Sequence, residues 1–150
     1  MKDFFATVYE TWFQLYDSQF PLIFDTLFDA SGYNKFGFLF ILIPLFLWLL
    51  FYYAWKYPYG KLWHWLVWLI ITVIVVSAST FSLASVAIFA SENPSLIDAI
   101  ADSESGYEDF ANSLPLKYAF INAVLTIGIG FIYSLILKQF SKIQIHLPFS

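Results

Sequence analysis

The sequence predicts an all-α polytopic membrane protein with three transmembrane helices and an N-terminal amphipathic helix at the membrane interface. Of the 150 residues, 60% are hydrophobic and 12% are charged, about half the charged fraction of roughly 25% that is usual in soluble domains. Residues 36–55, 63–90 and 118–137 contain no Asp, Glu, Lys or Arg. Each stretch reaches the roughly 20 residues that a helix needs to cross a bilayer.

Residues 1–35 are expected to form an amphipathic segment on the outer face of the membrane. Apolar side chains recur there at helical spacing, with acidic residues on the other side, which is typical of an interfacial helix. The apolar side comprises Phe4, Val8, Trp12, Leu15 and Tyr16. We therefore expect a helix from Phe4 to Tyr16 with Trp12 as an interface anchor, followed after Pro21 by a shorter helix.

The first two spans should form an antiparallel hairpin, because the segment between them is short and contains Pro58 and Gly60. Pro44 lies inside the first span and removes a backbone donor, so a neighbouring helix must accommodate a kink there. Aromatic residues gather around the hairpin turn and favour the membrane–water interface. The expected anchors in this belt are Trp55, Trp63 and Trp65.

Residues 91–117 are expected to form an acidic outer loop with short helices. Ser95 is a candidate N-cap with Asp98 three residues later, and a second short apolar stripe should end before Pro115. The third span then begins at residue 118, and residues 138–150 form a cytoplasmic tail.

The charges divide between the two sides that three spans create. All eleven acidic residues lie in residues 1–35 and 91–117, which with three Lys gives that side a net charge of −8, against +4 from four Lys on the other side. Positive residues favour the cytoplasm. We therefore expect a plasma or inner membrane protein whose N-terminus is outside and whose C-terminus is cytoplasmic.

Several function classes are excluded by residues that are missing. The spans contain no ionisable group for a proton relay, and the chain has no Cys for thiolate chemistry. All seven basic residues are Lys, and the net charge of the chain is −4. This charge balance argues against nucleic-acid binding. His64 and His146 lie at the predicted cytoplasmic boundary and do not face each other within the bilayer, so they do not suit a haem. We expect no catalytic residue, cofactor or metal site, and no enzymatic activity.

An acidic run at residues 102–109 invites a calcium interpretation but does not fit the EF-hand pattern, since Gly106 comes one place early. A solvated acidic surface is the better interpretation. Such a surface would concentrate cations at the outer face.

Small and polar residues follow one face of the third span, and a second group lies on the second span. Such residues let helices approach closely. The candidates for helix packing or pore lining are Ala119, Asn122, Ala123, Thr126, Gly130 and Ser134 on the third span, and Ser77, Thr80 and Ala84 on the second. Packing of these two spans against each other within one chain is an equally good interpretation.

Three functions remain open. The first is a non-enzymatic subunit of an oligomeric membrane assembly, which associates with itself or with other membrane subunits in the lipid bilayer through the small-residue faces of the second and third spans. The second is a pore or membrane-permeabilising effector with the acidic face as its outer vestibule. The third is a membrane-embedded accessory subunit of an enzyme. In the first case Gly130→Leu should disrupt assembly.

Overall fold

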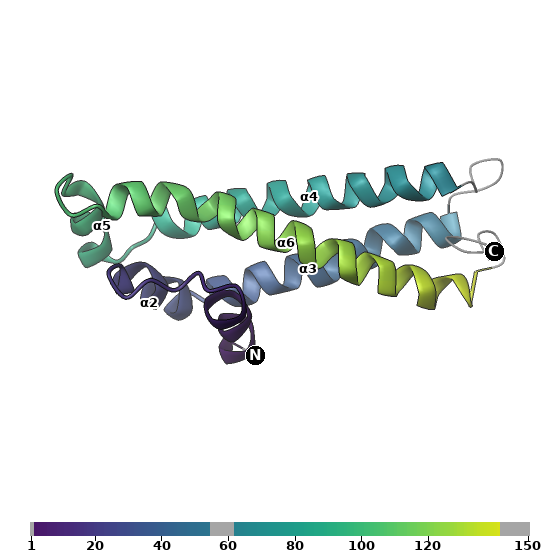
Figure 1. Cartoon of the computed structure of the whole chain (residues 1–150), viewed down its shortest axis with the longest axis horizontal. Helices are drawn as coiled ribbons and strands as arrows, with labels where there is room; N and C mark the ends of the chain where they lie inside the picture. The colour runs from purple at the N-terminus through teal and green to yellow at the C-terminus, as the bar shows by residue number, and fades with distance from the viewer. Residues whose placement is uncertain (1, 55–61, 142–150) are drawn as a thin grey trace.

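The computed structural model describes residues 2–54 and 62–141, which form a bundle of three long helices with shorter helices at one end (Figure 1). The long helices are α3 (Gly32–Leu49), α4 (Leu62–Phe89) and α6 (Tyr107–Lys138). A π-helical turn, η2 (Leu50–Ala54), continues α3. The described residues contain helices and no strand.

The expectation of three helices that are long and apolar enough to span a membrane is confirmed. They cover Gly32–Ala54, Leu62–Phe89 and Tyr107–Lys138, with 23, 28 and 32 residues. The second agrees with the predicted span to within one residue at each end. The first begins four residues early, at Gly32, because the uncharged stretch marks only what fits in hydrocarbon and not where the helix begins.

The sequence suggested that Pro115 separates a short loop helix from the third span, and the structure corrects this expectation. Helix α6 runs continuously from Tyr107 to Lys138 with Pro115 inside it. A proline in a helix costs roughly 3 kcal/mol in lost hydrogen bonding and steric conflict. Here Ala111, Leu114 and Tyr118 are fully buried on both sides of the proline, so tertiary packing holds the helix together across it.

The cap predicted at Ser95 is also corrected. Helix α5 (Pro94–Ala101) is capped by Asn93, whose Oδ1 accepts a hydrogen bond of 3.1 Å from the Ser95 amide. Pro94 occupies the first helical position, where its missing N–H and fixed φ favour helix initiation. The proline therefore sets the start of the helix, and the cap falls on the residue before it.

The N-terminal segment is helical but shorter than predicted, and it packs on the bundle. It consists of α1 (Lys2–Ala6) and the π-helical η1 (Thr7–Trp12), so the helix ends four residues before Tyr16. Phe5, Ala6, Val8 and Tyr9 are buried, whereas Phe4 and Trp12 are 59% and 69% exposed. The buried face is therefore rotated relative to the predicted one.

Gly37 on α3 accounts for this rotation. A Cβ atom added at Gly37 would lie 2.3 Å from the Phe5 ring, so only glycine leaves the space that the ring fills. The segment then ends where Gln14 adopts φ of 52°, a left-handed conformation that costs non-glycine residues about 1–2 kcal/mol. Tertiary contact with α3 thus decides which side of the N-terminal helix faces inward.

The two acidic regions meet at one end of the bundle, as three antiparallel spans require. Helix α2 (Pro21–Asp29) contacts α4 and α5 there (Figure 1). Asn93 Nδ2 donates a hydrogen bond of 2.9 Å to Thr26 Oγ1, and the Phe20 ring stacks on Phe110 with centroids 4.4 Å apart. Polar and aromatic contacts therefore join residues 17–30 to residues 91–110.

A side chain of α6 supplies a hydrogen bond near the proline of the first span. Pro44 is buried inside α3, and Tyr133 OH donates to the carbonyl of Ile41, three residues earlier, at 3.3 Å. Trp68 Nε1 donates at 2.8 Å to the carbonyl of Leu47, just before the π-helical turn. Side chains of neighbouring helices thus donate hydrogen bonds to α3 backbone carbonyls close to its irregular positions.

Candidate functional site

The small and polar face of α6 forms the centre of the bundle, with Asn122 as its most connected residue. Asn122 Nδ2 donates to Thr80 Oγ1 of α4 at 2.8 Å and to the carbonyl of Phe36 of α3 at 3.0 Å. Its Oδ1 accepts from Tyr9 OH of η1 at 2.6 Å. One fully buried amide therefore holds four segments of the chain together.

Tyr9 and Tyr33 attach the N-terminal segment to this centre. Burial raises the pKa of the Tyr9 phenol well above its usual range, because the charged form would lose its hydration. The phenol therefore stays protonated and donates to Asn122. One residue later, Glu10 Oε1 accepts a hydrogen bond from Tyr33 OH, so neighbouring residues of η1 bind two different helices.

Ser134 organises the other end of α6. Its hydroxyl lies 2.5 Å from Tyr52 OH of η2 and accepts a hydrogen bond of 2.8 Å from Trp65 Nε1 of α4. Ser141 Oγ then donates to the carbonyl of Tyr52 at 2.6 Å. This arrangement corrects the assignment of Trp65 as an interface anchor, because the side chain is 6% exposed and bonded inside the bundle.

Gly130 lies between these two polar sites and provides space for Trp48. A Cβ atom at Gly130 would lie 2.8 Å from Trp48 Nε1 and 3.3 Å from Leu69 Cδ1. Gly128, two residues earlier, has no such neighbour within 4 Å. The two glycines therefore lie in opposite environments on one helix.

The remaining predicted residues divide between the interior and the surface. Ala119 and Thr126 of α6 and Thr80 and Ala84 of α4 are buried, whereas Ala123 and Ser77 are half-buried. The structure thus brings the two small-residue faces together inside the chain. Of the predicted anchors, Trp12 and Trp63 are 69% and 67% exposed, and Trp55 lies outside the described residues.

Sequence reasoning missed the aromatic partners of this polar interior. Tyr9 and Trp65 donate hydrogen bonds to Asn122 and Ser134 of α6, and Tyr52 OH shares a hydrogen bond with the Ser134 hydroxyl. These partners could have been anticipated, because the hydroxyl of a buried Tyr and the indole N–H of a buried Trp usually have a hydrogen-bond partner. Tyr52 and Trp65 were grouped by their position in the sequence near the hairpin turn, and this grouping placed them in an aromatic belt instead.

The interior contains no arrangement suited to catalysis by a metal. Within residues 2–54 and 62–141, no three His, Asp or Glu side chains come close enough to hold an ion. Its polar groups are hydroxyls, amides and indoles. Those of Asn122 and Ser134 bond to neighbouring side chains, whereas Thr126 Oγ1 and Trp48 Nε1 are buried without a hydrogen-bond partner among the described residues. The bonded groups position helices.

Comparison with protein-family models, with curated proteins and with solved structures gives no match.

The Tyr9–Asn122 hydrogen bond should contribute measurable coupling to stability. In a double-mutant cycle of Tyr9→Phe and Asn122→Ala, we expect a coupling between about 0.6 kcal/mol, the average for hydrogen bonds between membrane helices, and about 1.7 kcal/mol, their maximum. The measurement is reversible unfolding in mixed detergent micelles. Tyr16→Phe, at a half-exposed tyrosine, serves as the control and should leave stability unchanged. Additive losses in the cycle would contradict the bond.

Gly130→Leu should destabilise the folded chain itself, because the new side chain would collide with Trp48 and Leu69. Overpacking of this kind costs about 1–3 kcal/mol. Gly128→Leu is the matched control, since it adds the same side chain to the same helix in open space. Thermal unfolding in detergent compares the two, and equal stabilities would show that the Gly130 contact is unimportant.

Proposed function

We propose that this chain is a non-enzymatic subunit of an oligomeric assembly within a membrane, and that it associates through the outer face of α4. The assignment to α4, and not to the polar face of α6, follows from where the structure leaves small residues uncovered. Five of the six α6 candidates are buried by contacts within the chain, and the sixth, Ala123, is half-buried.

Helix α4 is the most exposed of the three long helices. Only 17% of its most apolar 18-residue stretch is buried, compared with 39% for the first span and 28% for the third. Its buried residues follow one narrow stripe that includes Thr72, Val76, Thr80, Ala84 and Ile88. The rest of the helix surface is available to lipid or to another protein.

The outer side of α4 carries small residues that a lipid-facing surface does not need. Ala78 and Ser82 are exposed and one turn apart, and Ser79 and Ser85 beside them are half-buried. None of these hydroxyls has a hydrogen-bond partner among the residues that the structure describes. Lipid chains solvate large apolar side chains as well as a helix does, whereas small residues allow two backbones to approach closely. This outward small-residue surface carries the proposal.

A pore built by this chain has less support. The residues that could have lined it, Asn122, Thr126 and Ser134 among them, are fully buried and lie in contact with other helices of the same chain. An accessory role beside an enzyme would use the same outer surface of α4. Co-purification of a single enzyme with the full chain would favour that alternative.

Substitution on the outer face of α4 should weaken assembly without unfolding the chain. Ala78→Leu and Ser82→Leu should lower the oligomer mass in mild detergent, because larger side chains separate the helices at a cost of about 1–3 kcal/mol per site. Ile74→Leu, at a position 60% exposed on the same helix, preserves side-chain volume and should not change the mass. An unchanged oligomer in both small-to-large variants would contradict the proposal.

We also propose that the acidic end of the bundle faces outward and the Lys-bearing end faces the cytoplasm. The support is the positive-inside tendency, with four Lys and no acid on the second side. Because the chain has no Cys, single cysteines report on each end. A cysteine at Ser103 should react with an impermeant thiol reagent on intact cells, and one at Gln139 should not. The reverse labelling would reverse the orientation.

A further inference from the structure

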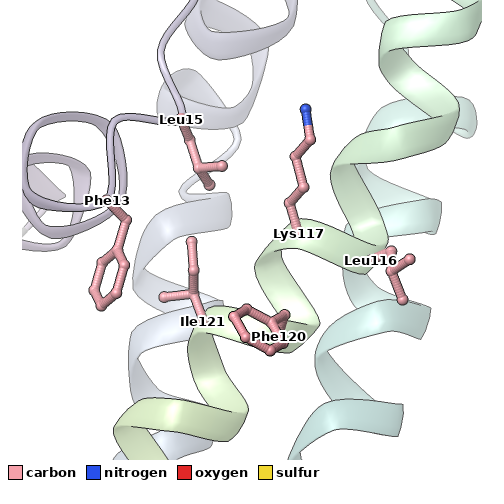
Figure 2. Close-up of a pocket in the computed structure, with 6 residues that line it drawn as sticks. All are labelled: Phe13, Leu15, Leu116, Lys117, Phe120 and Ile121. Carbon is pink, nitrogen blue, oxygen red and sulfur yellow. The ribbon is translucent and has the colours of Figure 1, made fainter.

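An apolar groove lies between the N-terminal segment and α6, and no residue of the proposed assembly surface on α4 lines it. Its volume is about 520 Å³, within the range of ligand pockets in proteins. Phe13 and Leu15 form one side, and Leu116, Lys117, Phe120 and Ile121 of α6 form the other. Figure 2 shows Ile121 between Phe13 and Phe120, with the Lys117 amine pointing away from these rings.

The charge at this groove is isolated. The Lys117 ammonium lies 5.0 Å from the centroid of the Phe110 ring, and it forms no ion pair within the part of the chain that the structure describes. Eleven acidic residues lie in the segments at this end of the bundle. Because no ion pair neutralises it among those residues, the Lys117 charge is available to an external anion.

The depth of these groups matches the layout of a phospholipid. Lys117 is the last charged residue before the uncharged residues 118–137, which places its ammonium at the boundary of the hydrocarbon core. Phe120 and Ile121 follow one turn deeper, about 5 Å along the helix axis. A phosphate therefore has a cation at headgroup depth, and an acyl chain has an apolar groove directly below it.

We propose that this groove binds one zwitterionic phospholipid, with an acyl chain between Phe13 and Ile121 and the phosphate on the Lys117 ammonium. The net charge of −8 on the segments at this end disfavours a headgroup with net negative charge. It favours one in which a cation, such as ethanolamine, accompanies the phosphate. This site is independent of the proposed assembly surface on α4.

The test is native mass spectrometry of the purified full chain in non-ionic detergent, with phosphatidylethanolamine added as the probe. We expect one lipid per chain, bound about fivefold more weakly by Lys117→Gln, as expected for one lysine near a membrane surface. Lys117→Arg should retain binding. Lys35→Gln is the matched control, because it removes an exposed lysine at the same end of the bundle that does not line the groove.

Two further lipids test separately the contribution of the phosphate and the preference for a zwitterionic headgroup. Diacylglycerol with the same acyl chains lacks the phosphate and should bind more weakly, with no loss in Lys117→Gln. Phosphatidylglycerol, which carries a net negative charge, should also bind more weakly than phosphatidylethanolamine. Equal binding of phosphatidylethanolamine by the original chain and Lys117→Gln would overturn the proposal. So would equal or tighter binding of either comparison lipid, or occupation of the groove by a second chain in place of lipid.

Discussion

The buried amide of Asn122 is the interaction on which the rest of the structure depends. An amide in an apolar interior costs several kcal/mol unless its donors and acceptor are satisfied. Asn122 reaches partners on η1, α3 and α4 at 2.6–3.0 Å, and each of these partners fixes the rotation of its own segment. The N-terminal segment is held on the bundle by the same bond, through Tyr9. The need of the Asn122 amide for hydrogen-bond partners thus constrains the relative positions of η1, α3, α4 and α6.

The polar interior changes where function should be sought in this chain. Hydroxyl, amide and indole groups in a membrane helix are often read as a path for ions or as an interface with another subunit. Here Asn122 and Ser134 bond to side chains of the same chain, and Gly130 makes space for Trp48. Their chemistry is used to assemble the monomer. The surfaces that we propose for partners are the outer face of α4, where small residues face outward, and the groove beside Lys117.

The two ends of the bundle are stabilised in different ways. At the acidic end, α2 and α5 pack through aromatic rings and the Asn93–Thr26 hydrogen bond. At the other end, Tyr52 and Trp65 converge on Ser134, each combining a large apolar ring with one polar atom. Aromatic residues make up 23% of the chain, and many of the large ones serve as internal donors. This use competes with their placement at the membrane surface, as Trp65 illustrates.

The sequence by itself determined the three helices that are long and apolar enough to span a membrane, their antiparallel order and the meeting of both acidic regions at one end. Each of these depends on a sum of local terms, because the transfer of a helix into hydrocarbon depends on its own residues. Only the tertiary structure decided which faces turn inward. The space above Gly37 accommodates the Phe5 ring, so Phe5 and not Phe4 is buried. Buried residues on both sides of Pro115 keep α6 continuous. Hydrogen-bond partners on three elements hold Asn122 inside the bundle. These outcomes depend on contacts between residues distant in sequence, and hydropathy along the chain does not contain that information.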